Sequence, residues 1–183
     1  MPGLNGLVVM TPTSIVSTGT GNSSSIGANG KVTFSSCVTL SLNGIFTSSY
    51  DNYMVVWRAV SNADQTGLGR LRASGTDATG ANYTRQYLLA NSTSVSADRE
   101  TSQTDFRAGS VSSNLRTGNT LFLFGPFLSQ PTAMRHVSVY ASSGGMVVDA
   151  ASTHSVSTSY DGLTLMFGTN NATGEVTVYG FNQ

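Results

Sequence analysis

Residues 38–57 read VTLSLNGIFTSSYDNYMVVW, and this stretch decides the fold class. Residues 38–42 alternate apolar and polar side chains, which is the two-residue period of a strand with one buried face. Asn43 and Gly44 follow, and both residues favour the positive φ angles of tight turns. The nearly continuous apolar run inside residues 53–60 is typical of a central strand in a sandwich. The stretch therefore predicts strand, turn and strand in succession.

The same pattern recurs through the rest of the chain. Short segments with apolar alternation or apolar runs are separated by Gly, Asn, Asp and Pro. Turn signals every ~8–12 residues are typical of sandwiches and jelly rolls. We therefore expect residues 31–183 to form one all-β domain, an antiparallel β-sandwich or jelly roll. The further expected strands are residues 68–73, 82–89, 120–124, 134–142, 162–167 and 175–181.

The longest span without Gly or Pro has no helical pattern. It runs from Ala81 to Ala108, and its middle, residues 91–105, is almost wholly polar. A stable surface helix would show a continuous apolar stripe. We expect this middle part to be a long loop or an edge strand.

The first 30 residues differ from the rest. They contain two of the four prolines, six glycines and no charged residue. Such a segment cannot build a core of its own. We expect residues 1–30 to be an extended arm whose apolar patches add strands to a neighbouring molecule. These patches consist of Leu7, Val8, Val9, Met10, Ile15 and Val16.

The charge balance argues against several kinds of partner. Net charge is zero, and charged residues make up 10% of the chain against a usual ~25%. Lys31 is the single lysine and the arginines form no basic run, so phosphate contacts to nucleic acid are not expected. No apolar stretch is long enough to cross a membrane, and from residues 1–10 we expect no secretion signal. A neutral surface is better suited to closed association between subunits.

Catalytic residue types are scarce. His136 lies in an alternating segment and His154 lies among Ser and Thr, so neither has a visible partner for nucleophilic catalysis. Glycosidases use a pair of carboxylates, and Asp98 and Glu100 are near in sequence, but they lie in the polar stretch, where we expect a solvated loop. Cys37 is the only cysteine and is expected to be a small buried residue. We expect no catalytic residues and no cofactor.

One loop has some of the oxygen ligands that calcium prefers. Residues 74–80 are rich in hydroxyl groups and flanked by glycine, but Asp77 is their only carboxylate. A calcium site would need Asp51, Asp64 or Asp161 to converge on the loop. We expect a hydrogen-bonded turn and no metal.

Sugar binding is the main alternative function. Trp57 could stack on a sugar ring, but its strand is the most apolar in the chain, so we expect it in the core. Tyr83 and Tyr87 share an alternating segment and are better candidates for exposed stacking. The alternatives are thus a carbohydrate-binding module and, with less support, a polysaccharide depolymerase.

Three sets of segments resemble small virion surface proteins of tailed bacteriophages, which are often described as minor tail proteins or capsid decoration proteins. The first joins residues 38–46 to residues 50–56, and the second joins residues 71–77 to residues 81–83. The third joins residues 160–165 to residues 173–181. Together they cover most of residues 38–183.

This resemblance implies a virion component on the exterior of the particle. Together with the scarcity of catalytic residue types, it leads us to expect a non-enzymatic structural protein. It further implies a homotrimer that contacts major capsid or tail proteins and is made in the cytoplasm of the bacterial host. A position on the capsid and a position on the tail stay equally open. The alternative implied role, recognition of a receptor, would add a host surface glycan as partner.

Overall fold

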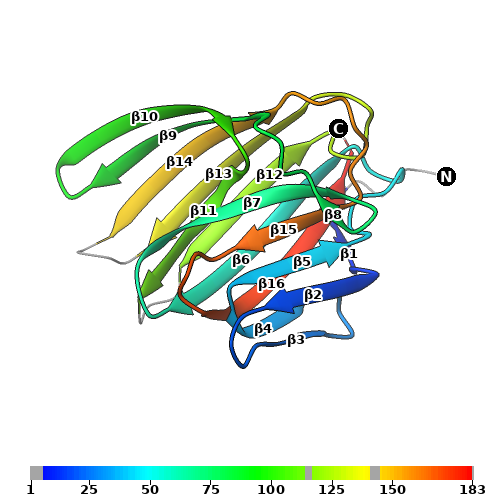
Figure 1. Ribbon diagram of the computed structural model, residues 1–183, viewed down its shortest axis with the longest axis horizontal. Helices are drawn as coiled ribbons and strands as arrows, with labels where there is room; N and C mark the ends of the chain where they lie inside the picture. Colours follow the sequence, from blue (N-terminus) through cyan, green and yellow to red (C-terminus); the bar gives the residue numbers. More distant parts are fainter. Residues whose placement is uncertain (1–5, 114–116, 141–144, 183) are drawn as a thin grey trace.

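The computed structural model describes residues 6–113, 117–140 and 145–182, and the fold in these ranges is all-β (Figure 1). Sixteen strands and no helix occur in them, so the all-β prediction is confirmed. The strands are β1 (Val8–Met10), β2 (Ser14–Thr18), β3 (Ser23–Ile26), β4 (Val32–Cys37), β5 (Thr39–Asn43), β6 (Asn52–Ser61), β7 (Gln65–Ala73), β8 (Thr76–Asp77), β9 (Tyr83–Asn91), β10 (Ser94–Gln103), β11 (Phe106–Ser113), β12 (Gly118–Phe124), β13 (Thr132–Tyr140), β14 (Met146–His154), β15 (Gly162–Met166) and β16 (Ala172–Phe181).

Hydrogen bonds join the strands into one large mixed sheet. Its path runs β10-β9-β14-β13-β12-β6-β11-β7-β15-β5-β2, and β16 pairs with the other side of β6. We call β10, β9, β14, β13, β12, β6 and β16 the main sheet, and β11, β7, β15, β5 and β2 the cover strands. Only a short pairing of β11 with β6 at Ser112 and Ser113 is parallel; the other described pairings are antiparallel. The sheet is therefore mixed, where the sequence predicted purely antiparallel strands.

A bulge in β11 allows this strand to leave β7 and pair with β6. The register of β11 on β7 shifts between Arg107 and Gly109, and Gly109 has a φ of 156°. A Cβ atom at Gly109 would lie 2.5 Å from the indole of Trp57 and 2.4 Å from the amide oxygen of Asn119. A glycine at this point lets β11 approach the main sheet closely and end beside β6.

The core lies between the main sheet and the cover strands, which cross over it in Figure 1. Alternate side chains of both contribute, so Val55 and Leu121 from the main sheet belong to one cluster with Leu71 and Leu163 from the cover strands. Trp57 belongs to the same core cluster and is 1% exposed. Cys37 is buried, as predicted.

The N-terminal segment differs from the predicted arm. Its strands pair with strands of the same chain: β1 with β16, β2 with β5, and β3 with β4. Met10 and Ile15 are partly buried against the core, whereas Leu7, Val9 and Val16 stay exposed. The segment lacks a core of its own, but it completes this chain's sheet instead of standing apart from it.

The polar stretch after β9 is an edge strand, one of the two predicted alternatives. β10 pairs with β9 along almost its whole length, and Ser92 takes a φ of 54° in the turn between them. Backbone hydrogen bonds therefore hold β10 in place despite its polar sequence. Among residues 6–113, 117–140 and 145–182 there is no helix that could cross a membrane.

Candidate interaction surface

The outward side of the main sheet forms a broad, uncovered face. Residues directly opposite each other in paired strands share a side of the sheet, so the register defines rows across it. One row is Tyr179, Met54, Phe122, Arg135, Ala151 and Gln86, and the next is Thr177, Val56, Thr120, Val137, Asp149 and Leu88. A third row is Glu175, Arg58, and then Gly118, Val139, Val147, Ala90 and Val95 on the strands beyond.

Apolar side chains are concentrated on this face. Eleven large apolar side chains are exposed among the described residues, and seven of them project here. Val139 and Leu88 are each 53% exposed and Val95 is 73% exposed. We call this set the outer apolar face: Val9, Val56, Leu88, Val95, Phe124, Val139 and Val147. Large exposed apolar side chains gathered on one face mark interaction sites in soluble proteins.

Charged side chains on the same face are paired with each other. Glu175 accepts from Lys31 at 3.2 Å and from Arg58, and these two cations lower the pKa of its carboxyl group. Arg135 and Asp149 form a bidentate pair with distances of 3.0 and 2.7 Å. This pairing lowers the pKa of Asp149 and raises that of Arg135. A partner can therefore cover these groups without supplying a counter-charge for each of them.

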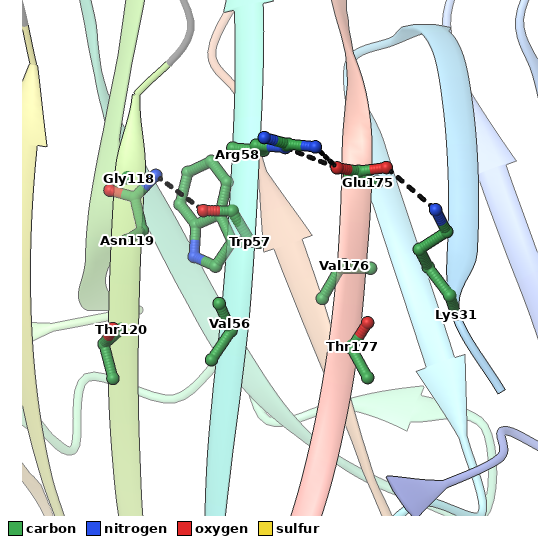
Figure 2. A pocket seen from close by; sticks show the side chains of 10 residues that line it. All are labelled: Lys31, Val56, Trp57, Arg58, Gly118, Asn119, Thr120, Glu175, Val176 and Thr177. Carbon is green, nitrogen blue, oxygen red and sulfur yellow. Dashed lines mark hydrogen bonds and ion pairs between the residues drawn. The ribbon is translucent and has the colours of Figure 1, made fainter. Parts of the chain in front are cut away.

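A shallow trough opens on the face where β12 begins (Figure 2). Its volume is about 330 Å³, and Val56, Thr120 and Thr177 line it beside the Lys31–Glu175–Arg58 ion pairs. Gly118 leaves the space open, because a Cβ atom there would meet nothing within 4 Å. The trough has the size and character to receive an apolar side chain from a partner.

The two histidines are both buried. His136 is 1% exposed, and its Nδ1 donates to the carbonyl oxygen of Arg107 at 2.9 Å. His154 is also 1% exposed, and its Nδ1 lies 3.4 Å from both the Val156 amide and the Tyr160 hydroxyl. Burial lowers the pKa of both rings, to about 4 for His136. Both are held as neutral core residues.

The acidic pair lies on β10 and not in a solvated loop. Glu100 forms ion pairs with two arginines: its carboxylate lies 3.0 Å from Arg85 Nε and 3.9 Å from Arg107 Nε. Arg85 also donates to Asp105 at 2.6 Å. Asp98 stays exposed, 3.5 Å from the Tyr87 hydroxyl. The expected solvated loop is thus wrong for Glu100, because pairing with β9 brings its carboxylate to a buried arginine.

The predicted turn at residues 74–80 is held by hydrogen bonds. Asp77 accepts from Arg72 and, at 2.6 Å, from the Thr164 hydroxyl. Asp161 accepts from the Ser74 amide at 3.1 Å, and the Asp64 carboxylate is bonded elsewhere, to the Ser113 amide. The Arg72 cation therefore balances Asp77. In the described part of the chain, no three His, Cys, Asp or Glu side chains are grouped as metal ligands would be.

The three aromatic candidates for sugar stacking have different surroundings. Trp57 is in the core, as predicted, and its Nε1 donates to the Ala108 carbonyl at 3.1 Å. Tyr83 is fully buried, and its hydroxyl is bonded to backbone atoms of Leu71 and Ala78. Tyr87 alone is partly exposed, with the Arg107 guanidinium 3.6 Å from its ring centroid.

Comparison of the chain with models of protein families gave no match, and comparison with curated proteins gave none either. The resemblance in its strand and turn motifs therefore stays a prediction. The outer apolar face was not predicted. The apolar run around Val55 predicts a central sandwich strand and does not indicate which side chains stay exposed; in the structure Met54 and Val56 project on the uncovered side.

The protein is expected to lose stability in mild acid through His136. The ring is neutral in the folded state, because its Nε2 is buried without a hydrogen-bond partner. The unfolded state binds a proton below its ordinary pKa of 6.5, whereas the folded state binds one only near 4. Stability is therefore retained above pH 6.5 and falls as the pH is lowered towards 4, by about 2 kcal/mol between pH 7 and 5.

Urea unfolding at pH 7 and pH 5 measures this loss. His136→Asn removes the titrating ring and keeps a donor for the Arg107 carbonyl, so its stability should change less between the two pH values. His154 leaves a residual dependence in the variant, because burial lowers its pKa in the same direction. Equal pH dependence of the variant and the parent protein would contradict the assignment to His136.

Proposed function

We propose that this protein is a non-enzymatic structural component of the exterior of a tailed-phage virion and assembles as a homotrimer. The observation that supports it most is the outer apolar face, which leaves large apolar side chains such as Leu88 and Val139 exposed on one side of a neutral chain. The strand and turn motifs that resemble virion surface proteins give the context. In this proposal the main sheet and the cover strands together are a variant of the β-sandwich of those virion proteins.

The dimensions of the face suit contact with further copies of the chain. The three outward rows described above are joined by a fourth at Phe124, Ala133 and Thr153. Seven strands spaced about 4.8 Å apart, with four rows roughly 6.8 Å apart, cover about 900 Å². A stable interface buries about 800 Å² on each partner. Three such faces turned towards a common axis would enclose a shared apolar interior. The internal ion pairs, such as Arg135–Asp149, would be covered there already neutralised.

Attachment to the particle would use the edge that the N-terminal strands provide. Among the described residues β2 pairs only with β5, so its other side offers free backbone groups. A strand from a major capsid or tail protein could add there, with Val16 projecting beside it at 53% exposure. This keeps strand addition as the mechanism and moves it from a free arm to a sheet edge.

A charge placed on the outer apolar face is expected to dissociate the trimer. Val139→Asp puts a carboxylate where the proposed interface excludes water, which costs several kcal/mol. Val16→Asp is the matched control, because Val16 is equally exposed but projects from a cover strand on the other side of the molecule. Light scattering at micromolar concentration should give about three times 19.1 kDa for the parent and the control.

The Val139→Asp variant should give about 19.1 kDa and still unfold cooperatively, at a lower melting temperature because subunit association no longer stabilises the folded state. A parent protein that is monomeric at this concentration would contradict the trimer. Immunogold labelling of purified particles tests the virion assignment separately. Label on the particle exterior supports it, and particles that lack the protein would refute it.

A further inference from the structure

A second hollow lies on the inner side of the main sheet, away from the outer apolar face. β9, β10 and β14 extend beyond the cover strands (Figure 1), and β11 and the start of β7 border the part left open. Side chains of β9, β14, β7 and β11 enclose about 250 Å³ there. That is the space of roughly eight water molecules, which fits one sugar ring.

Arg107 supplies hydrogen-bond donors to this hollow. Its side chain is 17% exposed and lies over the Tyr87 ring, which fixes the guanidinium plane. Its Nη1 makes one long hydrogen bond, 3.4 Å, to the Thr66 hydroxyl. Its Nε is buried and faces the Glu100 carboxylate at 3.9 Å, so donation to a ligand falls to the Nη atoms. Burial lowers the pKa of Arg107. A buried guanidinium with unused donors is costly unless a ligand or water accepts from it.

The remaining walls decide which ligand fits. Asp64, Thr66 and Ser110 line the hollow; the Asp64 carboxylate also accepts from the Ser113 amide, and the Ser110 hydroxyl is bonded to that of Ser138 at 3.0 Å. Leu89 and Val148 provide an apolar wall. Neighbouring hydroxyls of a sugar can accept from a guanidinium and donate to a carboxylate at once, while the C–H face of the ring lies on apolar side chains. A small anion fits less well, because Asp64 lines the hollow and Glu100 lies 3.9 Å from Arg107 Nε.

We propose that this hollow binds a single neutral hexopyranose ring, with Arg107 as the principal hydrogen-bond donor and Leu89 and Val148 as its apolar wall. The ring could be a free monosaccharide or one unit of a polysaccharide, which share this chemistry. The inference goes beyond virion assembly and is independent of it, because the hollow and the outer apolar face lie on opposite sides of the main sheet.

Saturation-transfer NMR on the whole protein tests the proposal with glucose, galactose and mannose as probes, and with sodium glucuronate as the charged counterpart. At least one neutral hexose should bind with a Kd of about 1–10 mM, and glucuronate should bind more weakly. The same experiment with oligosaccharides of the hexose that binds then distinguishes a free monosaccharide ligand from one unit of a polysaccharide. Tighter binding of the oligosaccharide indicates a polysaccharide unit, and equal binding indicates the free sugar.

Arg107→Gln should weaken binding at least tenfold, since a hydrogen bond to a charged donor is lost. Arg135→Gln is the matched control, because Arg135 lies on the outer side of the main sheet. Should Arg107→Gln fail to fold, Leu89→Phe is the second variant. Its larger ring fills the hollow and leaves Arg107 and Asp64 unchanged, so it should also abolish binding. The proposal is overturned if no neutral hexose binds up to about 50 mM, if glucuronate binds as well, or if folded Arg107→Gln or Leu89→Phe binds normally.

Discussion

Trp57→Ala is expected to lower the free energy of unfolding by about 3–5 kcal/mol. The indole is 1% exposed and its ring centroid lies 5.7 Å from that of Phe167. Truncation removes this packing, leaves a large cavity, and deprives the Ala108 carbonyl of its donor at 3.1 Å. Because that carbonyl belongs to β11, the change also loosens the contact between the cover strands and the main sheet.

Urea unfolding followed by circular dichroism measures this effect. Leu128→Ala is the matched control, because Leu128 is a large apolar residue outside the outer apolar face and is 40% exposed. Its loss should cost the monomer about 1 kcal/mol or less. A folded Trp57→Ala protein of normal stability that has lost sugar binding would contradict the core assignment and favour a lectin site at Trp57.

Two glycines bring the backbone of the cover strands directly onto the Trp57 ring, so a smaller residue at position 57 would leave a gap there. A Cβ atom at Gly67 would lie 2.8 Å from the indole, and one at Gly109 would lie 2.5 Å from it. Backbone of β7 and β11 therefore packs directly on the ring. Nothing in the spacing of Gly67 and Gly109 indicates this, because it depends on strands that are distant in sequence.

The sequence predicts the strands whose side chains alternate or run apolar. β5, β6, β12 and β16 lie close to the expected ranges, since their own residues carry the period of a half-buried strand. β10 has no such period; its polar sequence left a loop and an edge strand equally open. β11 and β14 were not predicted. Many of their residues are small or polar, and they form strands because neighbouring strands on both sides supply backbone hydrogen bonds.

The surface features depend on the same distant pairings. The apolar run around Val55 predicts a strand in the core, but it cannot distinguish a strand covered on both sides from one with Val56 exposed. Buried Arg85 and Arg107 likewise give no local signal. They are accommodated because Glu100 and Asp105 come into reach only when β10 folds back on β9 and leads into β11.

The N-terminal segment shows the largest difference between prediction and structure, and it can be tested by deletion. Removing residues 1–30 is expected to destabilise the protein by at least about 4 kcal/mol and lower its melting temperature by about 10 °C or more. Met10, Ile15 and Ile26 are partly buried against the core, and each would leave an apolar gap. The deletion would also strip β4 and β5 of a paired neighbour.

Thermal unfolding of the truncated protein measures this loss, and removal of residues 1–5 alone is the control, because it leaves β1 in place. The control should melt like the parent protein. Near-unchanged melting after removal of residues 1–30 would mean that β1, β2 and β3 contribute nothing to the folded domain. The segment would then act as the separate arm that its lack of charge suggested. A large loss of stability instead makes strands β1–β3 part of the domain and leaves the free side of β2 for a partner.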